Sequence, residues 1–491
     1  MLLAVWAAPK TASAHALGQS FQLPVPLWLY LAGAAIAVAA SFLITGIVAR
    51  PSTGAPSYPA LPLPEALTRP ASVTLRTLGL IWWLGAIAGG LLLGETTPVP
   101  AVLFWIGIWV GLPIATVTLG NPWPAFSPFR TIFAGLEGLA RPFGVRRLDV
   151  GLAYPAALAR WPAVFLLFAA IWSELVLPAS TAAPTVTRLL LGYTVVTLLG
   201  TAVFGRIAWL RNAELFEVLL GWYGRVGPIG RRTVAPEACD GCSEGCDPRR
   251  CIDCAECAIV AEPGERRVEL RPWFAGLTEV HGAGWSDAAV IVLALAGVSY
   301  DGLRETAIWG GALNAVFPAL IPFVGPFNAI LLADMLGLLT MWLGFLAAFG
   351  IALKLTRSPR LGAGAGTYAA TLLPIAAGYL IAHYLTVVIQ GVAWLPELLA
   401  NPITSVAPPV DWIPISAVWY LSVGAIVVGH IAAVVLAHRI ALREAQVRPI
   451  LAGVPLVVLM VGYTILSLWI IAQPIVIEPN VTPSAILVTD V

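Results

Sequence analysis

The sequence predicts an all-α polytopic membrane protein, with about ten transmembrane helices and a cytoplasmic cysteine-rich insert. Of its 491 residues, 59% are hydrophobic and 11% are charged, whereas soluble domains carry about 25% charged residues. Several apolar runs reach roughly 20 residues, the length that crosses a bilayer as a helix. The expected partner is therefore the lipid bilayer. A net charge of +1 without a basic tract gives no indication of nucleic-acid binding.

The hydrophobic runs form two membrane blocks with a polar insert between them. We predict five spans in residues 15–204 and five more in residues 286–491, with the insert covering residues 205–285. The 40 prolines and 46 glycines are compatible with this, because neighbouring membrane helices can satisfy the main-chain groups that such residues free. The predicted spans are 24–48, 77–95, 100–120, 161–178, 185–204, 287–303, 328–353, 366–389, 413–436 and 454–474.

The distribution of Lys and Arg predicts the orientation of these spans. Most of the arginines fall in one alternating set of loops, and such loops face the cytoplasm in membrane proteins. Both termini are then expected outside, and the insert is expected in the cytoplasm. Residues 1–14 end in Ala12-Ser13-Ala14 after a short apolar run. This ending is typical of a signal-peptide cleavage site, so a signal peptide is the expectation for these residues.

Two stretches outside the predicted spans are unlike ordinary loops. Residues 121–160 are predicted to form an amphipathic segment that lies on the membrane surface. Residues 304–327 are too apolar for a free external loop and contain Pro318, Pro322 and Pro326. We therefore expect this second stretch to be a re-entrant or interfacial piece.

The cysteines indicate a metal site in the insert. All six lie within residues 239–257, with the spacing C-x2-C-x3-C-x4-C-x2-C-x2-C. In a reducing cytoplasm disulfides are rare, and paired thiolates at x2 spacing are typical of zinc and iron–sulfur sites. Redox-sensing thiols or disulfides are the alternative. The predicted ligands are Cys239, Cys242, Cys246, Cys251, Cys254 and Cys257.

The spacing leaves the choice between zinc and an iron–sulfur cluster open. Two C-x2-C pairs, 239–242 and 254–257, would supply four thiolates for zinc. The three cysteines from 251 to 257 instead resemble the first ligands of a bacterial ferredoxin motif. The motif's fourth cysteine is replaced here by Ala258-Ile259-Val260. A cluster would then need Cys246 or Cys242 as its fourth ligand.

Four ionisable residues fall inside or at the ends of predicted spans, where each is a candidate site. Their positions along the helices place them within roughly 10 Å of one another in depth. A histidine with carboxylates in one leaflet predicts a second divalent-metal site or a general base. The alternative is that each is satisfied separately: Asp301 by Arg304, His383 by a carbonyl and Glu174 by water. The candidate catalytic residues are Glu174, Asp301, Asp334 and His383.

His430 is a candidate cofactor-binding residue in the predicted span 413–436. Together with His383 it would suggest a haem with two histidine ligands. The two residues differ in depth by roughly 18 Å at helical rise, whereas the axial ligands of one haem face each other at one level. We therefore expect no haem, and His430 either hydrogen-bonds within the bundle or binds a different ligand.

Several spans resemble a bacterial family of integral membrane proteins labelled fenitrothion hydrolase. The resemblance covers nearly all of the membrane portion and does not extend to residues 239–257. It implies a location in the bacterial inner membrane and hydrolysis of phosphotriesters. The stretches that carry it are PVPLWLYLAGAA (24–35), NPWPAF (121–126), WPAVFLLFAAIWSELV (161–176), LLLGYTVVTLLGTAVFG (189–205), SYDGL (299–303), YLIAHYLTVV (379–388), VWYLSVGAIVVGHIAAVVLAH (418–438) and VPLVVLMVGYTILSLWIIAQP (454–474).

Three functions follow as hypotheses. The first is a membrane-embedded metal-dependent hydrolase, in which a metal bound by Asp301, Asp334 and His383 activates water and Glu174 is a further ligand or base. The second is a membrane subunit of a redox complex, with an iron–sulfur cluster at the cysteines and partner subunits on the insert. The third is a transporter of ions or metals, which uses the same buried charges as an ion path.

Overall fold

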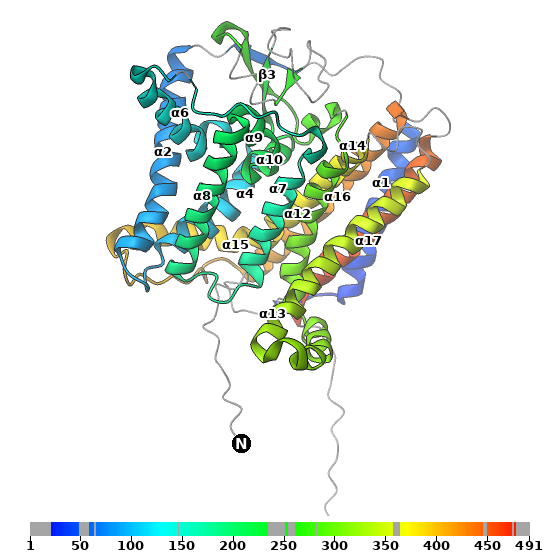
Figure 1. Ribbon diagram of the computed structural model, residues 1–491. Helices are drawn as coiled ribbons and strands as arrows, with labels where there is room; N and C mark the ends of the chain where they lie inside the picture. Colours follow the sequence, from blue (N-terminus) through cyan, green and yellow to red (C-terminus); the bar gives the residue numbers. More distant parts are fainter. Residues whose placement is uncertain are drawn as a thin grey trace, which may run out of the picture.

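The computed structural model describes residues 21–48, 58–62, 65–145, 147–233, 251–253, 261–280, 282–356, 364–444, 449–473 and 476–477. Over these residues the chain is mostly helical, as predicted, and its long helices form one bundle (Figure 1). A small sheet lies over one end of the bundle (Figure 1). Positions along the bundle are given below relative to the end that carries the sheet and to the opposite end.

Nine helices in the described part of the chain are long and apolar enough to cross a membrane. This confirms a multi-pass membrane protein. Two of the nine are continuous runs of several elements: α3 (Val99–Ala101), the π-helix η1 (Val102–Gly111) and α4 (Leu112–Thr118) form one, and α14 (Ala365–Ala369), η8 (Ala370–Leu372) and α15 (Leu373–Ala400) form another. The others lie in α1 (Leu27–Val48), α2 (Glu65–Leu92), α8 (Ala183–Phe204), α12 (Trp285–Arg304), α13 (Ala307–Leu355), α16 (Ile415–Glu444) and α17 (Pro449–Ala472).

The fourth predicted span, 161–178, is shorter in the structure than in the prediction. It is α7 (Trp161–Leu175), which has 15 residues, whereas a spanning helix needs about 20. α7 packs against α12 and α10 (Leu215–Gly224). The helix is not enclosed on all sides, because Trp161 and Phe165 are exposed.

The segment predicted as a re-entrant or interfacial piece, 304–327, is mostly helical. It begins α13, a helix of 49 residues that is broken at Gly325, where φ is 77°. This backbone conformation favours glycine, because a Cβ would be strained there. The part of α13 before the break lies beneath the end of the bundle opposite the sheet (Figure 1), and it exposes Ile308 and Phe323.

The predicted insert contributes both to the bundle and to the sheet. Its first part forms α9 (Arg206–Asn212) and α10, and nearly every residue of α10 is buried. Its later part supplies β3 (Ile229–Thr233), β4 (Cys251–Ile252) and β5 (Arg266–Leu270), to which β2 (Ala60–Pro62) adds a fourth strand. The order is β2-β5-β3-β4, and all neighbours are antiparallel. This sheet was not predicted from the sequence.

Two short strands pair near the ends of the described chain, and several short helices complete the fold. Phe21–Gln22 (β1) pairs in parallel with Val476–Ile477 (β6), so the two ends of the described chain lie together. The remaining elements are α5 (Trp123–Phe126), α6 (Pro128–Ala140), η2 (Arg141–Phe143), η3 (Ala156–Leu158), η6 (Pro263–Glu265) and η7 (Ala275–Glu279).

Two glycines allow α15 and α16 to pack with their backbones in contact. A Cβ on Gly378 would lie 2.4 Å from the carbonyl oxygen of Ala425, and one on Gly429 would lie 2.3 Å from that of Pro374. Both distances are too short for a real Cβ, and the obstructing atoms are main-chain atoms that cannot rotate away. Small residues at helix interfaces serve this close approach in membrane proteins. The contact fixes α15, which carries His383, against α16.

We expect Gly429→Ala to separate α15 from α16 and to lower the thermal unfolding temperature of the detergent-solubilised protein. Overpacking of this kind typically costs about 1–3 kcal/mol. Gly424→Ala on the same helix is the control, because nothing lies within 4 Å of a Cβ at that position. Its unfolding temperature should not fall, since alanine is the better helix former. Equal unfolding temperatures of the two variants would contradict the close contact between α15 and α16.

Candidate functional site

The clearest ionisable contact inside the bundle joins Asp301 of α12 to His383 of α15. The Nε2 of His383 lies 2.9 Å from Oδ2 of Asp301, and the Tyr384 hydroxyl donates a 2.7 Å hydrogen bond to the same oxygen. The His383 side chain is 1% exposed and that of Asp301 16%. Gly302 makes room for α15 here, because a Cβ at that position would lie 2.9 Å from the Tyr379 hydroxyl.

Tyr379 places a second phenol beside this contact. It precedes His383 by one helical turn, and the two rings stack with centroids 5.9 Å apart and an interplanar angle of 23°. Tyr379 is fully buried, and its hydroxyl has no hydrogen-bond partner among the described residues. The surroundings of Asp301 therefore contain two tyrosine hydroxyls and one imidazole.

Glu174, at the end of α7, belongs to the same group. Its carboxylate interacts electrostatically with Asp301 and with Arg304. Its Oε2 accepts a 2.6 Å hydrogen bond from the indole N–H of Trp109, which lies in η1. We refer to Glu174, Asp301, His383 and Tyr384 as the Asp301 cluster. It lies at the end of the bundle opposite the sheet, because α12 starts beside the sheet and ends at Arg304 (Figure 1).

Asp334 of α13 lies in a neighbouring cluster with partners of its own. Its Oδ2 is 3.3 Å from Nη2 of Arg304, and its Oδ1 accepts hydrogen bonds from Tyr300 (3.3 Å) and from the indole of Trp309 (3.2 Å). The hydroxyl of Tyr300 also donates to the main-chain oxygen of Asp334 at 2.7 Å. Gly337 leaves the space that the Trp309 ring occupies. Arg304 thus interacts with both clusters.

These positions divide the predicted metal constellation in two. Asp301 and His383 are adjacent, as predicted, and Glu174 is near them, whereas Asp334 pairs with Arg304. Asp301 itself is in contact with His383 and Tyr384, whereas the alternative interpretation of the sequence paired it with Arg304. No group of three or more His, Cys, Asp or Glu side chains in the described residues could hold a metal ion. Depth along a helix, used in the prediction, does not say which way a side chain points.

His430 of α16 makes a hydrogen-bond contact inside the bundle. Its Nδ1 lies 2.7 Å from the carbonyl oxygen of Ile426, one turn earlier on the helix. The residue is fully buried, and Nε2 has no partner among the described residues. This matches the expectation of a histidine bonded within the bundle. Binding of a ligand by His430 stays a prediction.

A further buried carboxylate, Glu214, was missed by the sequence analysis. It caps the N-terminus of α10, where its side chain accepts hydrogen bonds from the main-chain N–H groups of Phe216 and Glu217. The indole N–H of Trp123 donates to Oε2 at 2.9 Å, and the hydroxyl of Tyr193 donates to Oε1. Glu214 is 0% exposed, and this burial raises its pKa to about 7.

The next carboxylate on α10 has a cation of its own. Glu217 forms an ion pair with Arg130 of α6, with Nη2 and Oε1 3.0 Å apart and both side chains 9% exposed. Glu214, in contrast, accepts hydrogen bonds from neutral groups: two main-chain amides, an indole and a phenol. Residues 205–285 were predicted to be a polar insert, so the burial of Glu214 was not expected from the sequence.

A chain of packed aromatic side chains runs from Glu214 to Glu174 of the Asp301 cluster. Phe216 is at its centre, with its ring centroid 4.9 Å from that of Trp123, 5.8 Å from that of Tyr193 and 6.5 Å from that of Trp109. On one side of Phe216, the indole N–H of Trp123 donates to Glu214. Trp109 reaches Glu174 on the other side. The aromatic layer consists of Trp83, Phe104, Trp105, Trp109 and Phe216.

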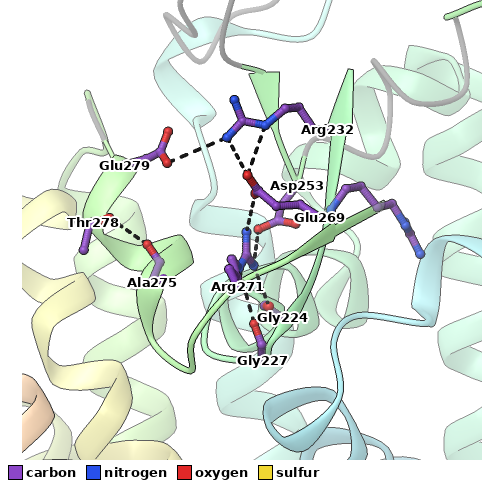
Figure 2. A network of polar contacts seen from close by, with 10 residues as sticks. Gly224, Gly227, Arg232, Asp253, Glu269, Arg271, Ala275, Thr278 and Glu279 are labelled. Atoms are coloured by element: carbon purple, nitrogen blue, oxygen red, sulfur yellow. Dashed lines mark hydrogen bonds and ion pairs between the residues drawn. The ribbon is translucent and has the colours of Figure 1, made fainter. Parts of the chain in front are cut away.

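A buried arginine holds the sheet that flanks the cysteine segment. Arg271 follows β5, is 1% exposed, and lies 2.6 Å from Asp253 and 3.8 Å from Glu269 (Figure 2). It also donates to the main-chain oxygens of Gly224 and Gly227, which connect the sheet to the end of α10. Glu269 in turn lies 2.6 Å from Arg232 of β3. This network ties the sheet to the bundle.

Most of the predicted cysteine ligands lie outside the described residues. Cys251 lies in β4, paired with Thr233 of β3, and the other five cysteines fall in 234–250 and 254–260. The main-chain N–H of Arg231 donates to the carboxylate of Asp253, two residues after Cys251. The sheet thus fixes one point of the cysteine segment, and metal binding there stays a prediction.

Comparison with known proteins leaves the family open. No family model, no curated protein and no solved structure matches this chain. The resemblance to the fenitrothion hydrolase family therefore stays a prediction from the sequence. The function has to be argued from the geometry of the clusters.

Proposed function

We propose that the protein is a membrane transport protein that carries protons, with Asp301, His383 and Glu174 as the groups that bind them. The observation that carries the proposal is the 2.9 Å contact between His383 Nε2 and Asp301 Oδ2, which joins two spanning helices. Ionisable side chains inside spans are costly, and they mark ion pathways and proton relays. Tyr384 extends the contact, because its hydroxyl donates to the same carboxylate oxygen.

Charge balance supports protons as the transported species. When they are ionised, Glu174, Asp301 and Asp334 carry three negative charges, and Arg304 supplies one fixed positive charge nearby. Unbalanced charge in a low-dielectric interior is costly. Two bound protons, one of them on His383, would neutralise the two clusters together. A site with this composition can gain and lose protons while one ion pair, Arg304 with Asp334, stays in place.

The hydrolase expected from the family resemblance receives less support from the same geometry. A phosphotriester would have to reach the imidazole of His383, whose side chain is 1% exposed. A hydrolytic metal site also needs about three protein ligands, and Asp334 is engaged with Arg304, Tyr300 and Trp309. Proton transfer requires neither an open pocket nor a third ligand.

Proton uptake by proteoliposomes tests the proposal. With an imposed pH gradient and a dye inside the vesicles, the wild-type protein should acidify or alkalinise the lumen faster than empty vesicles do. Asp301→Asn and His383→Gln should slow this by about a hundredfold, as expected when a proton-transfer group is removed. The control is Asp411→Asn, an exposed carboxylate between α15 and α16. Wild-type flux equal to that of empty vesicles, or unchanged flux in Asp301→Asn, would contradict the proposal.

Metal or redox chemistry at the cysteines would be a second property of the same chain. The six-cysteine spacing supports it, as either zinc or an iron–sulfur cluster. The described part of the sheet is compatible with it, because β3 and β4 bring the two ends of residues 234–250 together. A cluster would let partner subunits on the sheet side exchange electrons with the protein. The predicted cytoplasmic location of the insert is part of this second proposal.

A further inference from the structure

We infer that Glu214 is a second proton-binding site, reached through the hydroxyl of Tyr193. The inference rests on the proposed function, because a proton path through the bundle needs more than one group that binds protons. The Asp301 cluster supplies one acceptor. Glu214 supplies the other within the described residues.

The first argument is the hydrogen-bonding of the carboxylate. A fully buried carboxylate is normally neutralised by a cation, yet the contacts of Glu214 come from two amides, an indole and a phenol. In its neutral form one of its oxygens would carry a proton and could donate it. The phenol of Tyr193 is the contact that can accept such a hydrogen bond, because a hydroxyl is both donor and acceptor whereas amide and indole N–H groups only donate.

The second argument is that the phenol has an alternative acceptor. The hydroxyl of Thr197, one turn along α8, lies beside Tyr193. It is fully buried, and among the described residues no group donates a hydrogen bond to its oxygen. When Glu214 takes a proton, the Tyr193 hydroxyl can therefore turn from the carboxylate to Thr197. Both protonation states of Glu214 then keep a satisfied hydrogen-bond chain along α8.

The proton balance of the step is closed. The O–H bond of Tyr193 breaks as its proton passes to Oε1 of Glu214, and the phenol oxygen takes a proton from a hydronium ion, which leaves as a water molecule. The net change is one proton added to Glu214, and Tyr193 is unchanged. In the reverse step Glu214 returns the proton through Tyr193, or it passes the proton to another neighbouring group that accepts it.

The charges around Glu214 allow this change. Tyr193 faces it from α8 and Trp123 from α5, while Glu217 of α10 is neutralised by Arg130 of α6. Arg231 of β3 lies near Glu217 and Arg130. Burial raises the pKa of Glu214 from 4.5 to about 7. A group with such a pKa exchanges its proton near neutral pH, as relays require.

The pH dependence of stability has a definite sign. Between pH 4.5 and about 7 the folded protein keeps the Glu214 proton and the unfolded chain has lost it. The folded state then binds more protons, so its stability falls as pH rises through this window and levels off above it. Glu214→Gln should remove this part of the slope, because glutamine is neutral at every pH.

Infrared difference spectroscopy of the detergent-solubilised protein provides the direct test. The C=O stretching band of a protonated carboxylic acid should be lost as pH rises through about 7 in the wild type. Glu214→Gln should lack that band, and Glu137→Gln, a carboxylate paired with Arg206 at 3.3 Å, should keep it. Tyr193→Phe should keep the band with a shifted midpoint and should slow proton flux by about tenfold or more.

The outcomes separate this inference from the proposed function. If the band is absent from the wild type, or is present unchanged in Glu214→Gln, the second site is excluded even where vesicles take up protons. If the band behaves as described and wild-type flux equals that of empty vesicles, Glu214 binds a proton and the transport function fails. Loss of flux in both Asp301→Asn and Glu214→Gln, with the band lost only in Glu214→Gln, supports both.

Discussion

Replacing Arg271 with glutamine is expected to open the sheet and detach it from the bundle. Arg271 is 1% exposed, and it lies between Asp253 and Glu269, the second of which is also 1% exposed. Glutamine cannot supply a charge, so Asp253 would lose its cation and Glu269 would keep only Arg232. Removing one partner of a buried ion pair typically costs about 3–5 kcal/mol. The main-chain oxygens of Gly224 and Gly227 would lose their donor as well.

Limited proteolysis under native conditions measures this effect. Opening of the sheet should raise the rate of cleavage in residues 228–280 by more than about a hundredfold, because cleavage follows the population of the open form. Arg267→Gln on β5 is the matched control, since its guanidinium donates to main-chain oxygens at the protein surface. Such surface changes usually stay within about 0.5 kcal/mol. Equal cleavage of the two variants would show that Arg271 does not hold the sheet.

Loss of the predicted metal is the second large effect that we expect. Cys254→Ser with Cys257→Ser removes ligands common to the zinc and the iron–sulfur arrangements. Structural zinc contributes about 10–16 kcal/mol in small domains, so residues 239–257 should lose their order together with the metal. Elemental analysis and the visible absorption spectrum of anaerobically purified protein measure the loss. Absorption that disappears on reduction or acidification indicates iron–sulfur, and colourless protein with stoichiometric zinc indicates a structural site.

Ser243→Ala is the control for the cysteine variant, since it lies in the same segment and removes no thiolate. It should retain its metal. Wild-type protein that contains neither metal, with six freely titratable thiols, would exclude metal binding. The two large predictions are connected in the chain: Asp253, which Arg271 holds, follows Cys251 by two residues.

The sequence was sufficient to predict a helical multi-pass membrane protein, and it grouped Asp301 and His383 as members of one candidate site. Hydrophobic runs locate spans, and the position of a residue along a span gives its depth. Depth alone does not give rotation about the helix axis, which is why Asp334 was grouped with Asp301 although it faces Arg304. Trp109 was missed as a partner of Glu174, because their contact joins helices that are far apart in sequence.

The insert was the least predictable part for a physical reason. Its polar composition and its cysteines suggested one exposed module, but α10 carries enough apolar residues to join the core. Glu214 stands at the start of that helix, and its N-cap position is visible in the sequence only after the helix start is known. The strands β3 and β5 are five residues each and rich in arginine, so alternation of apolar and polar residues could not identify them.

The aromatic layer around Phe216 has an electrical consequence. Its ring centroids lie 4.7 to 6.5 Å apart, so a charge that moved between Glu214 and Glu174 would have to pass packed apolar rings. Part of the membrane voltage would then fall across the aromatic layer, between Glu214 and Glu174. Carrying one elementary charge through the full potential is worth about 2.3 kcal/mol per 100 mV. The fraction of Glu214 and Glu174 that carries a proton would therefore depend on the membrane voltage as well as on the pH on either side of the membrane.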